Sequence, residues 1–167
     1  MRFVYGLILT LILSSCSTTT VYIVRHAEKV NESDTTNLSP AGYIRAADLA
    51  KTLANRHIDS IFTTPYQRTR QTAQPLANQL NLPLIEYPAR PTQAIINRIT
   101  PMRNKTVLVV GHSNTILNIA KGLGAQPTLT QIESEDFDNL LQVKIYRGLF
   151  RRSVTTSLAT YGQVTPP

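Results

Sequence analysis

Val21-Tyr22-Ile23-Val24, followed directly by Arg25-His26-Ala27-Glu28, is the stretch of sequence that decides the fold. The first four residues are apolar, and most are β-branched. A run of this kind without polar alternation is typical of a strand that is covered on both faces. Charged and titratable side chains begin at the next residue. Ligands of open α/β sheets bind beyond the carboxyl ends of the strands, so Arg25 and His26 are predicted to lie at a binding edge.

The rest of the chain alternates strand and helix patterns. Further strands are expected at 60–63, 84–87, 106–110, 139–146 and 150–159, and helices at 39–55, 64–80, 92–99 and 115–123. This order predicts an α/β three-layer sandwich, in which helices cover both faces of a mostly parallel central sheet. An antiparallel edge strand or hairpin is expected near the C-terminus. Pro75 should bend or interrupt the second helix.

The composition is typical of one compact globular domain. The chain has 167 residues, of which 42% are hydrophobic and 16% charged, which excludes a disordered tail and a multi-span membrane protein. The net charge of +7 favours anionic partners. The sequence has no block of Lys and Arg interleaved with aromatic residues, so nucleic acid is not expected among them.

The first residues are predicted to be a secretory signal. Arg2 provides a positive charge, and residues 3–13 form an apolar stretch that is too short to span a bilayer core of about 30 Å. The segment Leu13-Ser14-Ser15-Cys16 resembles the lipobox of bacterial lipoproteins, which implies that cleavage leaves Cys16 as an acylated first residue. Cys16 is the only cysteine of the chain. An ordinary signal peptide with an incidental cysteine is the alternative.

The lipobox resemblance implies three parts of the chain. They are a lipoprotein signal peptide at 1–15, the lipidated Cys16 with a short tether at 16–20, and one folded domain at 21–167. The implied location is the bacterial cell envelope, lipid-anchored and extracytoplasmic. Ser17, in place of an aspartate, implies export to an outer membrane where one exists.

Two of the three histidines follow buried strands and have neighbours suited to an anion. Arg25 precedes His26, and Arg68 lies in the first turn of a helix, from where it can reach the same edge. The other histidine, His112, sits at a strand-to-helix turn whose free backbone N–H groups favour negative charge. Its neighbours there are Gly111, Ser113 and Asn114.

Phosphoryl transfer needs groups of these kinds. A neutral imidazole is a competent nucleophile, and guanidinium groups bind the phosphoryl oxygens with paired hydrogen bonds. A second, protonated histidine adds a donor and a compensating charge. Two structural histidines bonded to the backbone are one alternative. A zinc site of His26, Glu28 and His112 is another, although Arg25 and Arg68 would repel the cation.

Three segments, in order and at the right spacing, resemble the motifs of the histidine phosphatase (phosphoglycerate mutase-like) superfamily. They are Arg25-His26-Ala27-Glu28, Thr64-Pro65-Tyr66-Gln67-Arg68-Thr69-Arg70-Gln71-Thr72-Ala73 and Val109-Val110-Gly111-His112-Ser113-Asn114. The resemblance implies that His26 is the nucleophile and that Arg25, Arg68 and His112 are catalytic residues that bind the phosphoryl group. Asn114 is expected among the substrate-binding residues. The resemblance also implies a reaction without metal or cofactor.

The acid that protonates the leaving group is less clearly marked. Many members of the superfamily carry a Glu or Asp for this step between the second and third motifs, where Glu86 is the only carboxylate from residue 61 to residue 131. Glu28, Glu32 or Asp34 is the alternative, or no dedicated acid exists. A leaving nitrogen is protonated easily, so a phosphoramidate substrate would depend less on general acid catalysis.

The sequence thus predicts a membrane-anchored phosphatase that hydrolyses a small phosphate monoester or phosphoramidate through a phosphohistidine on His26. A non-catalytic, anion-binding lipoprotein on the same fold is the alternative from another class. A phosphomutase is a third reading, although the chain lacks the insertions that enclose a phosphosugar or phosphoglycerate. The acidic loop 133–138 is expected to be solvated. The basic cluster Arg147, Arg151 and Arg152 is expected to be solvated or to contact lipid headgroups.

Overall fold

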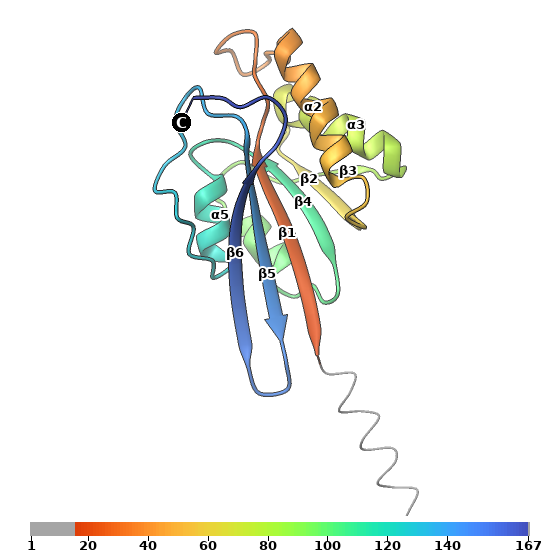
Figure 1. The fold of residues 1–167 in the computed structure, drawn as a ribbon, viewed down its shortest axis with the longest axis vertical. Coiled ribbons are helices and arrows are strands. Elements are labelled where there is room, and N and C mark those ends of the chain that lie inside the picture. The colour runs from red at the N-terminus through yellow and green to blue at the C-terminus, as the bar shows by residue number, and fades with distance from the viewer. Residues whose placement is uncertain (1–15, 167) are drawn as a thin grey trace, which may run out of the picture.

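The computed structural model describes residues 16–166, so the predicted signal peptide at 1–15 lies outside the described residues. Ten elements lie within the described residues (Figure 1): β1 (Ser17–Arg25), α2 (Pro40–Leu53), β2 (Ser60–Thr63), α3 (Gln67–Leu80), β3 (Leu84–Glu86), α4 (Gln93–Ile99), β4 (Thr106–Gly111), α5 (Ile116–Gly122), β5 (Asn139–Arg147) and β6 (Arg152–Thr160). None of the helices within 16–166 has the length and apolar character that crossing a membrane requires.

The strands form one sheet in the order β3-β2-β4-β1-β5-β6. β1, β2, β3 and β4 run parallel, while β5 and β6 form an antiparallel hairpin at the edge. The predicted α/β class, mostly parallel with an antiparallel hairpin near the C-terminus, is confirmed.

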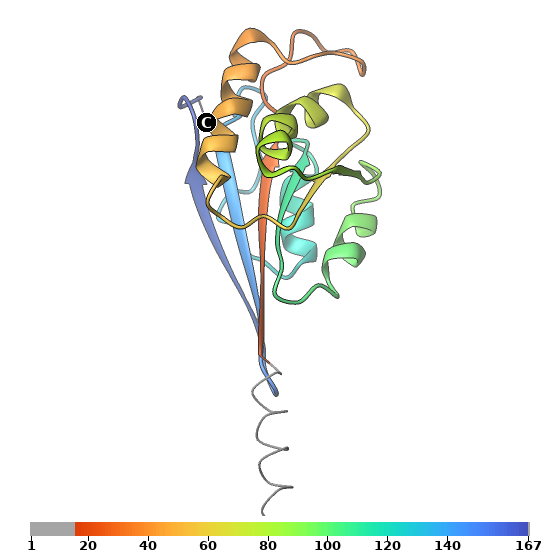
Figure 2. The ribbon, with the colours of Figure 1, turned by 90° about the vertical axis from the view of Figure 1, so that its right-hand side faces the viewer.

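Helices cover both faces of the sheet, and the central strand β1 contributes to both layers (Figure 2). Ile23 packs in the cluster with α4 and α5, and the next residue, Val24, packs in the cluster with α2 and α3. Both side chains are 0% exposed. Alternate burial on the two faces explains why the segment Val21–Val24 shows no polar alternation.

The start of β1 differs from the expected tether. The strand begins at Ser17, so residues 17–20 belong to the sheet rather than to a linker. The threonines in this segment are β-branched and suit a strand. Thr19 is 0% exposed, and its hydroxyl donates a hydrogen bond to the Met102 carbonyl at 2.9 Å. The folded domain therefore follows Cys16 directly.

The expected break at Pro75 does not occur. α3 continues through this residue to Leu80. The flanking Ala73, Leu76 and Ala77 are all buried against the sheet and α2 layer. Pro75 cannot donate the backbone hydrogen bond of a regular helix, and the packing of these three side chains keeps the segment helical at that point.

The first turn of α2 lies against the segment that follows β1. Ser39 caps the helix, as its side chain accepts a hydrogen bond from the Gly42 N–H at 3.1 Å, and Pro40 is the first helical residue, as predicted. A Cβ on Gly42 would lie 2.1 Å from the Glu28 carbonyl oxygen. Only glycine therefore lets the helix approach this strand exit so closely.

Replacing this glycine should destabilise the domain. Helix propensity alone would make Gly42→Ala stabilising by about 1 kcal/mol. The clash with the Glu28 backbone instead predicts a loss of about 1–3 kcal/mol in the free energy of unfolding. Urea unfolding measures this difference. Ala41→Gly, at the exposed neighbouring position, is the control for propensity alone. A Gly42→Ala protein as stable as the wild type would contradict the close approach.

Candidate active site

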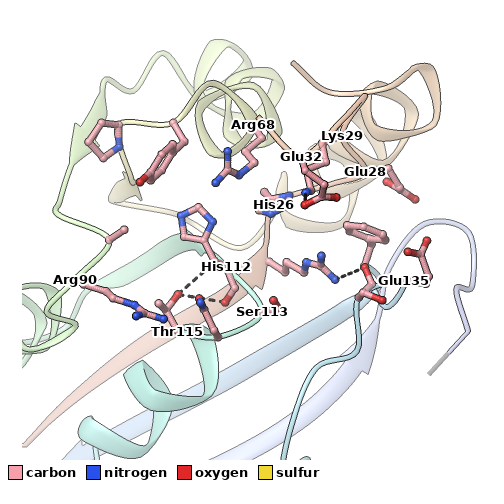
Figure 3. Close-up of a pocket in the computed structure, with 17 residues that line it drawn as sticks. His26, Glu28, Lys29, Glu32, Arg68, Arg90, His112, Ser113, Thr115 and Glu135 are labelled. Carbon is pink, nitrogen blue, oxygen red and sulfur yellow. Dashed lines mark hydrogen bonds and ion pairs between the residues drawn. The ribbon is translucent and has the colours of Figure 1, made fainter. Parts of the chain in front are cut away.

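A pocket of about 930 Å³ opens where β1 and β4 end. Figure 3 shows the side chains of His26, Arg68 and His112 turned toward one another in it. The structure therefore brings together the residues that the sequence singled out on three different elements. The pocket is lined by Arg25, His26, Glu28, Lys29, Glu32, Pro65, Tyr66, Arg68, Ala89, Arg90, His112, Ser113, Asn114, Thr115, Ser134, Glu135 and Phe137.

His26 is buried and fixed as one tautomer. Its ring Nδ1 lies 2.8 Å from the Ala27 carbonyl oxygen. A carbonyl can only accept, so Nδ1 carries the proton and the lone pair is on Nε2. Burial, and after it the positive charge of Arg25, lower the pKa of His26 to about 3. The ring is therefore neutral at physiological pH, which is the form that a nucleophile requires.

Arg25 is held by the loop that precedes β5. Its Nη1 donates to the carbonyls of Glu133 and Ser134, each at 2.8 Å, and to that of Asp136 at 3.1 Å. The guanidinium carbon lies 4.0 Å from the centre of the Phe137 ring. The sequence analysis expected the loop 133–138 to be solvated. This expectation is wrong in part, because the loop backbone and Phe137 enclose Arg25.

Arg68 is held in a similar way by the loop after β1. Its Nη1 donates to the Asp34 carbonyl at 3.3 Å, and its guanidinium carbon lies 4.4 Å from the centre of the Tyr66 ring. The Asp34 carboxylate is 3.8 Å away, but its side chain is 81% exposed. Two loops and two aromatic rings therefore position the two arginines.

Both arginines keep a donor free. The Nε atoms of Arg25 and Arg68 are buried and have no hydrogen-bond partner among residues 16–166. An unpaired donor on a buried charged group is costly. Both residues line the pocket, where an anion with several oxygen atoms would compensate the two charges.

His112 approaches His26 from the end of β4. The ring centres are 5.4 Å apart, and His112 Nε2 is within 3.0 Å of the Thr64 hydroxyl. Burial, followed by the charges of Arg68 and Arg25, lowers the pKa of His112 to about 4. The expected protonated His112 is therefore wrong for the ligand-free site, where burial, and then the two nearby guanidinium groups, disfavour a positive charge on this ring.

Several pocket residues were missed by the sequence analysis. Tyr66 lies against both Arg68 and the His112 ring. Phe137 lies against Arg25. Arg90 and Lys29 add two cations, Arg90 on the His112 side of the pocket and Lys29 on the His26 side (Figure 3). Tyr66 lies inside the second motif, whereas the other three residues lie outside the three motifs, so no sequence signal marked them.

The two carboxylates proposed first as general acids are both engaged in ion pairs. Glu28 lines the pocket, but its two oxygens accept three hydrogen bonds from the buried Arg45. Glu86 pairs with Arg70 and does not line the pocket. Glu86 is therefore in the wrong place for the acid, because β3 ends on the far side of β2 from β1.

Two other carboxylates lie at the pocket rim. Glu32 pairs with Lys29, and its side chain is 93% exposed. Glu135 has no ion-pair or hydrogen-bond partner for its side chain among the residues described, and it was not a candidate from the sequence. Asn114 lines the pocket beside His112, as expected of a substrate-binding residue.

The described residues offer no ready metal site. Across 16–166, no three side chains of His, Cys, Asp or Glu gather as metal ligands would. His26, Glu28 and His112, the alternative zinc ligands, do not form such a group.

The lowered pKa of His26 predicts how stability depends on pH. Between about pH 6 and pH 4 the unfolded chain binds a proton on this residue and the folded chain does not, so acid destabilises the fold. Replacing the residue, as in His26→Asn, should reduce the slope of the unfolding free energy against pH by up to about 1.4 kcal/mol per pH unit. Urea unfolding at a series of pH values measures both slopes. Equal slopes would show that His26 is not buried as a neutral group.

Comparisons with known proteins agree with this arrangement. Residues 21–90 match the family model of the histidine phosphatase superfamily, branch 1. This stretch includes His26, Arg25 and Arg68. No curated protein sequence matches the chain.

Solved structures share the fold at low sequence identity. A protein assigned as the phosphohistidine phosphatase SixA of Agrobacterium tumefaciens is 21% identical, with a TM-score of 0.59 over 84% of this chain and 97% of that one. Its counterpart from Nakamurella multipartitia is 17% identical, with a TM-score of 0.61 over 90% and 98%. A phosphoserine phosphatase of Entamoeba histolytica, solved with phosphoserine, is 18% identical, with a TM-score of 0.57 over 86% and 96%. The chain is therefore similar to the histidine phosphatase superfamily over residues 21–90, and it shares the fold of these solved structures.

Proposed function

We propose that the protein is a membrane-anchored phosphatase that hydrolyses a small phosphate monoester or phosphoramidate, with His26 as the nucleophile and without metal or cofactor. One observation carries the proposal. Two enclosed arginines, Arg25 and Arg68, line the pocket together with a neutral imidazole whose lone pair is on Nε2. This combination supplies the nucleophile and the compensation of charge that phosphoryl transfer needs.

The reaction proceeds in two displacements. In the first, His26 Nε2 attacks phosphorus, a P–N bond forms, and the P–O or P–N bond to the leaving group breaks. Arg25 and Arg68 hold the phosphoryl oxygens, and His112 donates a hydrogen bond once substrate provides or attracts a proton. In the second, water attacks the phosphohistidine. This step breaks the P–N bond, releases inorganic phosphate and restores His26.

The leaving group distinguishes the two substrate types. An alkoxide leaves only with a proton, so an ester of an aliphatic alcohol needs a general acid. A phosphoramidate nitrogen is basic and takes its proton more easily. The engagement of Glu28 and Glu86 in ion pairs favours the phosphoramidate. Glu135 is the remaining rim carboxylate that could serve an ester. Two of the similar solved structures, a protein assigned as a phosphohistidine phosphatase and a phosphoserine phosphatase, support one substrate of each type.

Replacing the nucleophile should abolish turnover. We expect His26→Ala to lower kcat on phosphoramidate and on an aryl phosphate by more than about 10³-fold. Arg68→Ala should lower it by about 10²–10³-fold because a preorganised donor is lost. Both effects are measured as the release of inorganic phosphate from these substrates by the purified full chain. Arg70→Ala is the matched control, since Arg70 lies on the same helix but pairs with Glu86 outside the pocket.

Two outcomes would contradict the proposal. No turnover of either compound by the wild type would favour the non-catalytic, anion-binding alternative. Turnover that survives in His26→Ala would reject the phosphohistidine mechanism while leaving a phosphatase.

The membrane anchor is the second part of the proposal. The lipobox resemblance of Leu13-Ser14-Ser15-Cys16 supports acylation of Cys16, and the thiol of this residue is free and exposed. The domain begins at Ser17, so an acylated Cys16 would hold it next to the bilayer. We place the protein in the bacterial cell envelope, on the extracytoplasmic side, with export to an outer membrane where one exists.

Removing the thiol should release the protein. Cys16→Ser is expected to move the chain from the membrane fraction to the soluble fraction or to stop its processing, because no acyl acceptor remains. Cell fractionation with metabolic labelling by a fatty-acid analogue measures this, and Ser17→Ala is the control that keeps the thiol. Unchanged membrane association and mobility of Cys16→Ser would contradict lipidation.

A further inference from the structure

The turn between β5 and β6 presents two adjacent apolar side chains to solvent. Phe150 is 95% exposed and Leu149 is 52% exposed. Both views place this turn beside the start of β1, at the opposite end of the molecule from α2 and α3 (Figures 1 and 2). A single exposed apolar residue is ordinary, but two neighbours at a protruding tip suit insertion into an apolar phase.

Four arginines surround these side chains. They are Arg103, Arg147, Arg151 and Arg152, and with Leu149 and Phe150 they border one shallow hollow of about 450 Å³. We call these six residues the hairpin-tip surface. None of the four forms an ion pair with a carboxylate among residues 16–166. The surface therefore carries a concentrated positive charge that the described part of the chain does not neutralise.

The arginines are held in place by backbone oxygens. Arg147 donates to the Thr100 carbonyl and Arg152 to the Leu123 carbonyl, each at 2.7 Å. Burial, and next the charges of Arg103 and Arg152, lower the pKa of Arg147. The chain thus keeps like charges close together, which favours an anionic partner.

The chain enters the domain at this same surface. Ser17 at the start of β1 pairs with Arg147 at the end of β5. A Cβ on Gly148, within the turn, would lie 3.9 Å from Cys16 Sγ. Cys16 therefore lies beside Gly148, in the turn that carries Leu149 and Phe150.

We propose that the hairpin-tip surface docks on a bilayer with anionic headgroups, its arginines on the lipid phosphates and Leu149 and Phe150 in the acyl boundary. This docking depends on the anchor at Cys16, which is part of the proposed function. That anchor would bring the tip to the membrane, and the charge and the apolar pair fit the two layers found there. Each cation close to an anionic surface strengthens binding by up to about fivefold.

The absence of tryptophan from the sequence allows a clean test. Phe150→Trp in the full chain, reconstituted in vesicles, places a single fluorophore at the tip. We expect its emission to shift to the blue and to be quenched by brominated lipid when phosphatidylglycerol is mixed with phosphatidylcholine, and much less in phosphatidylcholine alone. Val30→Trp is the matched control, because Val30 is also exposed, at 62%, but lies in the loop beyond the other end of β1.

A charge variant separates docking from anchoring. Arg151→Gln in the Phe150→Trp chain should lower the ratio of docked to undocked tips by up to about fivefold. Arg56→Gln, an exposed arginine after α2, should leave the ratio unchanged. Flotation of the vesicles measures whether the chain is attached to the membrane, independently of whether the tip is inserted.

The outcomes are distinct. If the Phe150→Trp chain floats with vesicles but its tryptophan emission shows no blue shift and no quenching by brominated lipid, docking is overturned and the anchor is left intact. A chain that does not float with anionic vesicles would overturn both. A blue shift with duplex DNA but not with anionic vesicles would overturn lipid docking in favour of a nucleic acid. None of these readouts depends on turnover by His26, so the phosphatase proposal is tested separately.

Discussion

The enclosure of two guanidinium groups next to the nucleophile is the constraint on which the rest of the structure depends. Arg25 and Arg68 are enclosed by backbone carbonyls and aromatic rings, which orient a positive charge but do not neutralise it. Burying charge costs stability. Burial, and after it the charges of these arginines, keep the two histidines unprotonated, so the ligand-free pocket is prepared for an anion and for nucleophilic attack.

The central part of this site could be predicted from the sequence because it depends on local signals. An apolar strand that ends in Arg25-His26 and another that ends before His112 place both histidines at one edge, if the strands are parallel neighbours. The structure pairs β1 with β4 in parallel, with Arg25 opposite Gly111. Arg68 followed from its place in the first turn of α3. The fold class needed only the order of strands and helices.

The rest depends on contacts that no local pattern shows. Arg25 and the carbonyl that it contacts at Glu133 are 108 positions apart. The pairing of Glu28 with Arg45 removes a plausible acid, and it depends on how closely α2 approaches the strand exit. The threonines at the start of β1 resemble a linker in sequence. They become a strand because β5 pairs with all of them and β4 joins on the other side from Thr20 onward.

The length of β1 also sets how far the candidate active site would lie from the membrane. The strand starts beside Cys16 and ends beside His26, and its nine residues span about 27 Å at about 3.3 Å per residue. With Cys16 at the bilayer, His26 would stand about that far above the headgroups, several times the Debye length of about 8 Å at physiological salt. Phosphate compounds in the surrounding water would then reach the pocket without repulsion from an anionic membrane. Phosphates embedded in the lipid would remain out of reach.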